Sequence, residues 1–384
     1  MAGVCANRAA RILYVTRVAP LGEKPMSVKS LVQRAGTTCL LFAALSLASV
    51  YAQTKPNIVI LGTGGTIAGA GVAATNTSDY KSAVVPVDAV IDNVPAIKNI
   101  ANVRGEQVFQ IGSESFNDER LITLAKRVSA LLKQPDVDGI VITHGTDTIE
   151  ETSYFLNLTV KSAKPVVVVG SMRPGTALSA DGALNLYEAV IVASAKESAG
   201  KGTLVVMNDE IHSGRDVSKT NTFKIDTFKS PYGPLGYVVE GQAQYYRAPV
   251  RPHTIYSGFD IDTITTLPRV GIAYGYGNVD RVAVDAMVAS GVKGIAYAAT
   301  GNGSMSEFMV PAMIEARGKG VQIVRASRTG SGVVVRNGEQ PDDKYDFIVV
   351  GDQNPQKARI LLALALANGP TNDTAGLQKI FWSY

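Results

Sequence analysis

The sequence predicts an α/β protein of two domains, with a parallel sheet in a larger N-terminal domain and a smaller C-terminal α/β domain. Short runs rich in Val and Ile alternate with segments of helical periodicity. The alternation lapses once, over residues 246–266, and then resumes. The length of 384 residues and the hydrophobic content of 46% suit two folded domains with their own cores.

The first domain is expected to span residues 53–245. One helix is predicted from Asn117 or Asp118 to about Lys133, because apolar residues recur there near helical spacing, and another begins at Asp181. The predicted strands between the helices are apolar on both faces, which is typical of strands buried in a parallel sheet. They are Asn57–Leu61, Gly139–Thr143, Pro165–Gly170 and Thr203–Met207.

Residues 246–266 are polar, contain two prolines and are interpreted as a linker. The second domain is expected to span residues 267–384, with helices near 280–290, 306–317 and 355–367. Ligands of open α/β sheets bind beyond the carboxyl ends of the strands, so the residues after those ends are the candidate site. The predicted strands of this domain are Val270–Tyr274, Gly294–Tyr297, Val321–Arg325 and Phe347–Val350.

Residues 1–52 are interpreted as a secretory signal peptide. An apolar stretch over 35–50 follows basic residues, is short for a membrane span, and precedes small residues around Ala52. A membrane anchor is the alternative. Residues 1–25 are long for a leader, and Met26 is a more natural start. Both cysteines, Cys5 and Cys39, fall in this segment, which leaves none for disulfides or thiolate metal sites in the mature chain.

The charge of the chain is concentrated in the same segment. Residues 1–52 contain six of the 37 Lys and Arg residues and one of the 33 Asp and Glu residues, so the remainder is close to neutral. A near-neutral body offers little electrostatic attraction to a phosphate backbone. We therefore expect no nucleic-acid partner, and no membrane association once the leader is cleaved.

The first predicted strand runs into a glycine-rich turn, residues 62–69, with the sequence GTGGTIAG. Ile67 occupies the position where a dinucleotide fingerprint requires its third glycine, and no Gly-Lys-Ser/Thr follows for a P-loop. A simple tight turn is the structural interpretation. The functional interpretation is a turn that presents the Thr63 and Thr66 hydroxyls beside backbone N–H groups.

The second candidate segment follows Gly139–Thr143 and reads HGTDT, His144 to Thr148. Asp147 and Thr148 are good helix caps, which is its structural interpretation. A hydroxyl beside a carboxylate at a strand end can also bind an amine and polarise water. No nucleophile elbow or histidine cluster accompanies His144, so a structural role is favoured for it and a metal site is not expected.

Two further segments carry candidate side chains. Ser113 and Glu114 place a hydroxyl beside a carboxylate after Val108–Ile111, and Lys219 lies in a polar segment over 214–221. A solvated surface lysine is the ordinary interpretation of Lys219.

Together these segments resemble the bacterial type II L-asparaginases, and within them the glutaminase-asparaginase branch. The resemblance covers roughly residues 56–384. Two long signatures in the right order make it specific, TGGTIAG over 63–69 and ITHGTDT over 142–148. Further matches are Gly170–Pro174, Ser179–Gly182, Gly214–Asn221, Tyr232–Gly236 and Asn354–Arg359.

The resemblance implies an asparaginase/glutaminase-like fold and hydrolysis of the side-chain amides of L-asparagine and L-glutamine, without a cofactor or metal, through a threonine acyl-enzyme. Thr66 corresponds to the nucleophile, Tyr80 lies in a mobile loop over it, and Glu339 completes that group. Thr146, Asp147 and Lys219 form a second catalytic group. The residues expected to contact substrate are Gly65, Ser113, Glu114, Thr146, Asp147 and Ser304.

The resemblance also implies a periplasmic homotetramer, a dimer of dimers, with sites at subunit interfaces. Ser304 and Glu339 would then act in a neighbour's site. Glu114 and Ser304 occupy positions where some members have Gln and Asn, and the members with Glu and Ser are those with appreciable glutaminase activity. We therefore expect dual specificity.

The sequence leaves alternatives to test. A periplasmic amino-acid-binding protein without catalysis also has a leader and two α/β domains, and ammonia release from asparagine distinguishes it from an amidase. A racemase of similar layering would use paired cysteines. A tRNA-linked amidase that shares these signatures is cytosolic and has an added domain.

Overall fold

The structure is a computed structural model that describes residues 54–368 and 373–384. Lys55–Tyr384 forms one compact unit. The predicted signal peptide and both cysteines lie outside the described residues. Of the helices in the described part of the chain, none has the length and apolarity needed to cross a membrane.

Within the described residues, the larger sheet has eight strands in the order β12-β11-β8-β7-β6-β5-β1-β4. Every residue of the central strands β5 to β7 is buried, because helices cover both faces. This confirms the predicted parallel sheet with apolar strands. Its parallel strands are β1 (Asn57–Gly64), β4 (Asn102–Ile111), β5 (Gly139–Thr143), β6 (Val166–Val169) and β7 (Thr203–Met207).

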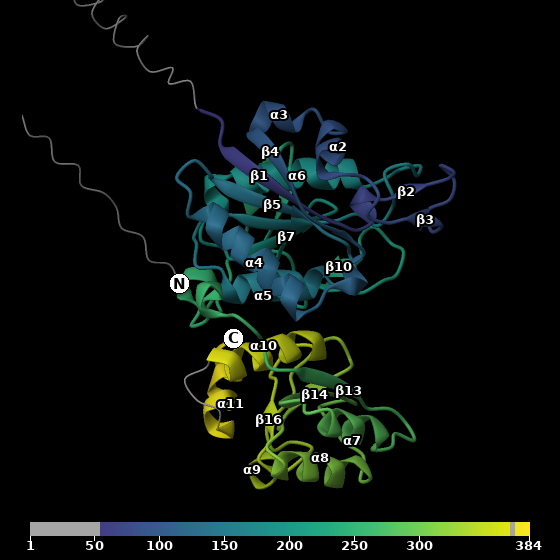
Figure 1. Ribbon diagram of the computed structural model, residues 1–384, viewed down its shortest axis with the longest axis vertical. Coiled ribbons are helices and arrows are strands. Elements are labelled where there is room, and N and C mark those ends of the chain that lie inside the picture. The colour runs from purple at the N-terminus through teal and green to yellow at the C-terminus, as the bar shows by residue number, and fades with distance from the viewer. Residues whose placement is uncertain (1–53, 369–372) are drawn as a thin grey trace, which may run out of the picture. The chain divides into compact units, whose positions relative to one another are not determined.

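Helices lie on both sides of this sheet (Figure 1). α4 (Asp118–Leu132) and α5 (Ile149–Thr159) pack together on one face. α2 (Val87–Asp92), α3 (Ile97–Ile100) and α6 (Gly182–Ser194) lie on the other. The two layers of helices exclude water from the sheet and leave its strand ends as the accessible edge.

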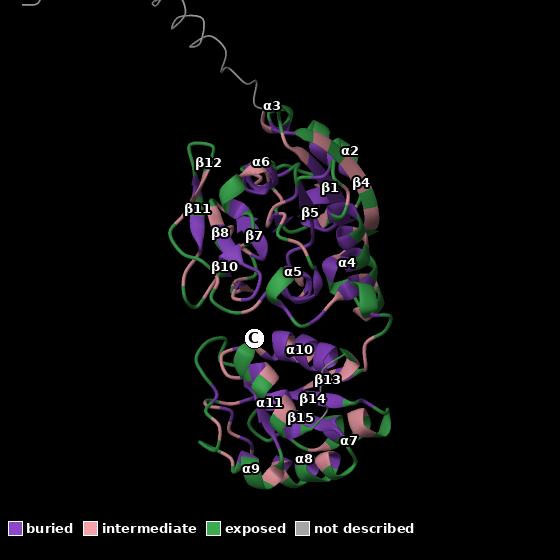
Figure 2. Cartoon of the chain, turned by 90° about the vertical axis from the view of Figure 1, so that its left-hand side faces the viewer, coloured by how far each residue is buried: buried purple, intermediate pink, exposed green. Residues whose placement is uncertain are grey.

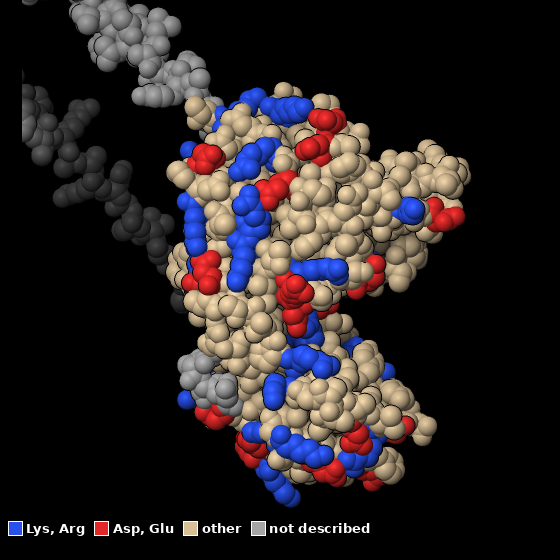
Figure 3. Space-filling model, viewed as in Figure 1, with Lys and Arg blue, Asp and Glu red and all other residues tan. Residues whose placement is uncertain are grey.

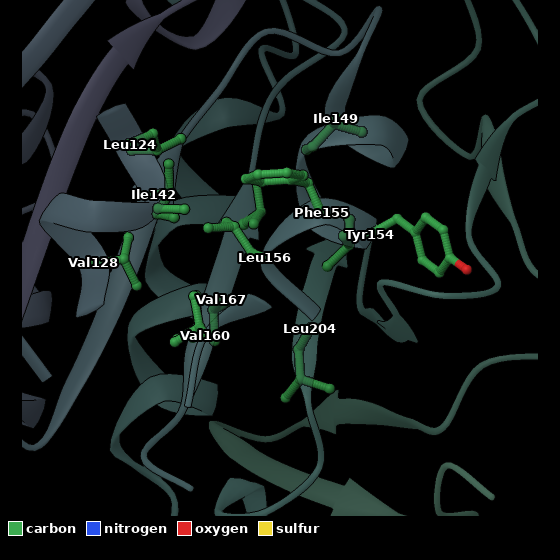
Figure 4. Close-up of a cluster of buried hydrophobic side chains, with 14 of the residues drawn as sticks. Leu124, Val128, Ile142, Ile149, Tyr154, Phe155, Leu156, Val160, Val167 and Leu204 are labelled. Atoms are coloured by element: carbon green, nitrogen blue, oxygen red, sulfur yellow. The ribbon is translucent and has the colours of Figure 1, made fainter. Parts of the chain in front are cut away.

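The start of α4 agrees with the sequence prediction. The Asn117 side chain accepts a hydrogen bond of 2.9 Å from the backbone N–H of Arg120, and thereby caps the helix. Leu124 and Val128 of α4 pack beside Ile142 of β5 in the core (Figure 4). Complete burial of such a side chain contributes about 1.5–3 kcal/mol, so this layer anchors the strand that leads into the candidate site.

One edge of the larger sheet is antiparallel, which the sequence analysis did not predict. It consists of β8 (Glu210–Ser213), β11 (Gly236–Val239) and β12 (Gln242–Tyr245). Two-residue turns with positive φ connect β7 to β8 and β11 to β12. Such turns match the twist of a hairpin. The strands are short and partly polar, so their sequences lack the signal of a buried strand.

The C-terminal domain has a parallel sheet in the order β13-β14-β15-β16. These strands agree with those predicted for this domain. Their bounds are β13 (Val270–Tyr274), β14 (Gly294–Ala299), β15 (Gln322–Ser327) and β16 (Ile348–Val349). The helices of this domain are α7 (Val282–Ala289), α8 (Met309–Gly318), α9 (Asp342–Tyr345), α10 (Pro355–Asn368) and α11 (Thr374–Ser383).

Helix α10 lies between the smaller sheet and helix α5 of the larger domain. It packs on β13 and β14 of its own domain and on α5 of the larger one. Most of its side chains are buried, as its purple colour in Figure 2 shows. Arg359 of α10 also pairs with Asp118 at 3.0 Å and with Glu151 at 3.3 Å. The first turn of α10 therefore lies against the larger domain.

Residues 246–266 contain two short 3-10 helices, η4 (Thr254–Tyr256) and η5 (Ile261–Thr263). Asp262 of η5 pairs with Lys133 at 2.5 Å and packs against α4.

On the molecular face shown in Figure 3, basic and acidic side chains are interspersed. That face presents no broad field of one sign.

Candidate active site

The candidate site lies where three neighbouring parallel strands end. The strand order places β1 between β5 and β4, and the register pairs the end of β1 with the ends of both neighbours. The segments that follow these ends carry Thr66, Thr146 and Ser113, and all three residues are buried. The sheet therefore brings three hydroxyl-bearing segments to one edge, as expected for this class of fold.

Two glycines let these segments approach closely. A Cβ atom at Gly65 would lie 2.3 Å from the Cα atom of Gly145, and one at Gly145 would lie 2.6 Å from the Ser113 hydroxyl oxygen. Gly65 also has a φ of +78°, which side chains disfavour. Thr66 and Thr146 each follow one of these glycines. Each turn contains a Gly-Thr pair, Gly65-Thr66 or Gly145-Thr146. Because the glycines have no side chains, the two hydroxyl-bearing turns can pack against each other.

Thr66 begins the 3-10 helix η1 (Thr66–Ala68), and its hydroxyl lies 2.6 Å from the phenol oxygen of Tyr80. Tyr80 belongs to β3 (Tyr80–Lys81), which pairs with β2 (Ala70–Gly71). We call residues 70–81 the flap. Most residues between its strands are exposed. The flap therefore places a proton-transferring group in direct contact with the Thr66 hydroxyl.

Thr146 contacts a lysine rather than a tyrosine. The Lys219 ammonium donates a hydrogen bond of 2.9 Å to the Thr146 hydroxyl oxygen and another of 2.6 Å to an Asp147 carboxylate oxygen. Lys219 belongs to β9 (Ser218–Lys219), and its side chain is 18% exposed. The Asp147 side chain is 58% exposed. These three residues form a contact group whose carboxylate remains open to a cationic ligand.

Ser113 joins the group from the third segment. Its hydroxyl oxygen accepts a hydrogen bond of 3.1 Å from the backbone N–H of Asp147, and its carbonyl accepts one of 2.8 Å from the Thr148 hydroxyl. Ser113 belongs to the 3-10 helix η2 (Ser113–Ser115), and the next residue, Glu114, is exposed. The Ser113 hydroxyl proton is therefore free to point toward a ligand beside Asp147.

Sequence profiles of two domains match most of the described chain. The profile of the N-terminal asparaginase domain matches residues 57–251, and that of the C-terminal glutaminase/asparaginase domain matches residues 269–381. The chain belongs to the asparaginase family. This confirms the resemblance that the glycine-rich and His-Gly-Thr-Asp signatures indicated.

Individual relatives agree with the profiles. A glutaminase-asparaginase of Pseudomonas fluorescens biotype A is 57% identical over 361 residues, which cover 93% of this asparaginase and 99% of the relative. A probable periplasmic L-asparaginase of Haemophilus influenzae is 47% identical over 344 residues, covering 89% and 97%. The crystal structure of a probable cytoplasmic L-asparaginase from Campylobacter jejuni matches with a TM-score of 0.83 and 44% identity, covering 86% and 100%.

His144 of this asparaginase is fully buried beneath the Thr146 turn. Its Nδ1 lies 2.7 Å from the Gly145 carbonyl oxygen, so Nδ1 donates, and its Nε2, 2.9 Å from the Thr152 hydroxyl, accepts. The Phe116 ring packs on the imidazole with centroids 4.5 Å apart. Burial lowers the pKa of His144 to about 4. A neutral, fixed imidazole agrees with the structural interpretation of this residue.

Two predicted residues belong to the C-terminal domain and have no hydrogen bond to this group within the described residues. Ser304 forms an isolated antiparallel bridge with Thr300, and Glu339 is exposed. Within the described residues, neither makes a hydrogen bond to Thr66, Tyr80 or the Lys219 group. One chain of this asparaginase thus brings together the predicted site residues of the N-terminal domain, but not Ser304 or Glu339.

Three residues near the site received no role in the sequence analysis. Buried Glu150 and Lys357 form a hydrogen-bond network with partly buried Asn354 beneath Lys219. Glu150 lies three residues after Asp147 of the His-Gly-Thr-Asp signature, and the other two belong to the Asn354–Arg359 match. Their presence in matched segments was the available signal. The hydrogen bond between Glu150 and Asn354 is visible only in the structure, because Glu150 lies far from the other two residues in the sequence.

Proposed function

We propose that this protein hydrolyses the side-chain amides of L-asparagine and L-glutamine to the corresponding acids and ammonia. The observation that carries the proposal is the approach of two hydroxyl-bearing turns at one sheet edge, one in contact with Tyr80 and the other with Lys219 and Asp147. The family membership and the names of the relatives support it.

In this proposal, the Thr66 hydroxyl attacks the carboxamide carbon while its proton passes to the Tyr80 oxygen, which lies 2.6 Å away, and Tyr80 relays its own phenol proton to the departing nitrogen. The carbonyl π-bond opens, and its oxygen becomes the negatively charged oxygen of a tetrahedral intermediate. Collapse of the intermediate breaks the C–N bond, and the nitrogen leaves as ammonia with the transferred proton. Water then attacks the ester and releases the acid, and Thr66 regains its proton.

The tetrahedral oxyanion requires hydrogen-bond donors that are already in place. The Gly65 N–H is occupied, since it donates to the Ile111 carbonyl at 3.0 Å. The backbone N–H groups of Thr66 and Thr146 have no hydrogen-bond partner among the described residues. We assign the oxyanion to these two groups. The predicted contact of Gly65 with substrate then arises from its backbone and from the space left by its missing side chain.

The group formed by Thr146, Asp147 and Lys219 orients the substrate and prepares the departure of the amide nitrogen. The Lys219 ammonium polarises the Thr146 hydroxyl, to which it donates at 2.9 Å. The exposed carboxylates of Asp147 and Glu114 would hold the α-ammonium group, and the Ser113 hydroxyl would hold the α-carboxylate. The two ends of an amino acid are thereby distinguished by charge, and the side-chain amide is directed toward Thr66.

We further propose that the protein is secreted to the periplasm and acts as a homotetramer, a dimer of dimers. Secretion is supported by the character of residues 35–50 and by the Haemophilus influenzae relative, which is named periplasmic. Assembly is supported by the finding that, within the described residues of one chain, neither Ser304 nor Glu339 makes a hydrogen bond to Thr66 or Tyr80. In the assembled protein they would complete a neighbour's site, with Glu339 orienting Tyr80.

Ammonia release from both amides by the purified mature protein tests the function. We expect turnover of glutamine within about tenfold of asparagine, a difference of about 1.4 kcal/mol or less in activation free energy. Thr66→Ala should lower kcat by about 10³-fold or more, because it removes the nucleophile. Thr63→Val is the matched control, since Thr63 lies near the end of β1, three residues before Thr66, and its hydroxyl donates to the Thr143 carbonyl at 2.9 Å. Binding of the amino acids without ammonia release would contradict the proposal.

A further inference from the structure

The backbone around Lys219 is held by side chains from other elements. β9 is only two residues long, and among the described strands it pairs only with β10 (Phe228–Lys229). The N–H of Lys219 donates to a Glu150 carboxylate oxygen at 2.9 Å. The Lys357 ammonium donates to the carbonyls of Arg215 and Val217, each at 2.6 Å. The residues before Lys219 therefore depend on side chains of α5 and α10 for their position.

Glu150 lies in the first turn of α5, three residues after Asp147, and is only 8% exposed. One oxygen of its carboxylate accepts from the Lys219 N–H, and the other accepts from the Asn354 amide at 3.3 Å. A helix N-terminus favours this negative charge. The same helix start thus carries the Asp147 carboxylate that meets the Lys219 side chain and the Glu150 carboxylate that meets the Lys219 backbone.

The first turn of α10 holds the opposite side of the network. Asn354 also donates to the Ser218 hydroxyl at 3.2 Å, while its own amide oxygen accepts from the Lys357 N–H at 2.9 Å. Lys357 is fully buried, and this burial lowers its pKa to about 8 against the opposing attraction of Glu150. Because both ends of the Asn354 amide are used, the amide cannot rotate without the loss of a hydrogen bond.

We propose that Glu150 is a positioning residue which, together with Asn354 and Lys357 of the C-terminal domain, sets the place of the Lys219 ammonium relative to Thr146. The inference rests on the proposed amidase function. Lys219 has a long side chain with several rotatable bonds, so the location of its backbone decides whether the ammonium reaches Thr146. A displacement of about 1 Å in a reacting constellation can cost about 10²-fold in rate. The C-terminal domain thereby supports the site of its own chain.

The first variants are Glu150→Ala and Glu150→Gln. Alanine removes both acceptors. Glutamine keeps an oxygen for the Lys219 N–H but turns its amide nitrogen toward the donating amide of Asn354. We expect kcat to fall about 10²-fold for alanine and about tenfold for glutamine, with partial rescue by glutamine showing that the retained acceptor matters. KM for asparagine should change less than kcat, because Ser113 and Asp147, which would bind the substrate, do not belong to β9, the strand that Glu150 positions.

Glu151→Gln is the matched control. Glu151 is the next residue of α5 and contacts the same helix α10 through Arg359 at 3.3 Å, but within the described residues it makes no hydrogen bond or ion pair to β9. Its removal should alter the contact between the helices and leave kcat within about twofold of the wild type. Asn354→Ala is a second probe of the network should Glu150→Ala fail to fold, and we expect it to lower kcat about tenfold.

A double-mutant cycle with Lys219→Met decides whether Glu150 acts through Lys219. Ammonia that accumulates over hours is measured with and without Glu150→Gln in that background. We expect the tenfold effect of Glu150→Gln to shrink below about twofold once Lys219 is absent. An equal effect in both backgrounds, an equal loss from Glu151→Gln, or unchanged kcat in Glu150→Gln and Asn354→Ala would overturn the inference. Those results would leave the amidase function intact, whereas an inactive wild-type protein would contradict the function itself.

Discussion

The two halves of the candidate site are held in different ways. In one half, the Thr146 hydroxyl meets Lys219 and Asp147, and the Lys219 backbone is fixed from beneath by buried side chains. In the other half, the Thr66 hydroxyl meets Tyr80, which belongs to a flap with two-residue strands and exposed connecting residues. One half is thus supported by buried side chains of α5 and α10, and the other depends on a surface segment.

This difference separates two requirements of the proposed reaction. Charged groups act most strongly when they are fixed before the substrate arrives, which suits the Lys219 half. Substrate must also enter and product must leave, which suits a segment with few buried contacts. The comparison indicates that changes in the Lys219 half should affect stability as well as rate, whereas changes in the flap should affect mainly rate.

Acid should destabilise the folded protein through His144, which is buried beneath the Thr146 turn. The pKa of His144 is about 4 in the folded protein because of burial, and near 6.5 in an unfolded chain. The unfolded state therefore takes up a proton between these values, and the free energy of unfolding should fall by about 3 kcal/mol from pH 6.5 to 4. Unfolding by urea at a series of pH values measures this slope. The His144→Asn variant should show a shallower decline over the same range, and an identical decline would remove His144 from the explanation.

Tyr80→Phe should separate rate from stability in the flap half. Loss of the phenol oxygen removes the partner of the Thr66 hydroxyl, and we expect kcat to fall about 10²-fold. The unfolding midpoint should be nearly unchanged, because the neighbouring flap residues are exposed. Steady-state kinetics and thermal unfolding of the same preparation test both expectations. Asp79→Asn, an exposed neighbour on the flap, serves as the control, and a full rate in Tyr80→Phe would exclude the proposed proton transfer.

Glu339→Ala should reveal whether the flap half is completed by a second subunit. We expect about a tenfold loss of kcat, because Tyr80 would lose its orienting carboxylate. Mixed tetramers formed from Glu339→Ala and Thr66→Ala chains should recover part of the activity, since some sites would then combine an intact Thr66 with an intact Glu339. Mixtures with no more activity than the separate variants would argue against a shared site.

Glu114→Gln should produce the smallest effect, a change in substrate preference. The carboxylate is exposed beside Ser113, where a longer substrate would place its α-ammonium group. We expect kcat/KM for glutamine to fall about threefold relative to asparagine, a difference below 1 kcal/mol, on the order of an exposed ion pair. Competition between the two amides in one reaction measures the ratio directly. A change in favour of glutamine would reverse the proposed role of Glu114.

Much of this fold was predictable from the sequence, for a physical reason. Strands covered on both faces must be apolar throughout, so β5 and β6 stand out as short Val- and Ile-rich runs. Because parallel strands end at one edge, residues such as Thr66 and Thr146 could be grouped before their geometry was known. The glycines beside them, Gly65 and Gly145, indicated a close approach of the backbone.

Other features of the structure could not be predicted from the sequence. The antiparallel edge depends on the turns Asn208–Asp209 and Glu240–Gly241, whose positive φ values are not signalled by the usual Asn-Gly pair. The Glu150 carboxylate accepts from a backbone N–H at Lys219, and any residue in that place offers the same N–H. Contacts of this kind depend on tertiary placement rather than on residue type, so a single sequence does not reveal them.

The central claim is that the Thr66 hydroxyl, and not that of Thr146, forms the covalent bond to the substrate acyl group. Rapid acid quenching during turnover of asparagine, followed by proteolysis and peptide mass spectrometry, locates the ester. The proposal predicts an aspartyl ester on the peptide that contains Thr66, and its absence in Thr66→Ala. An ester on the Thr146 peptide, or one that persists in Thr66→Ala, would contradict it.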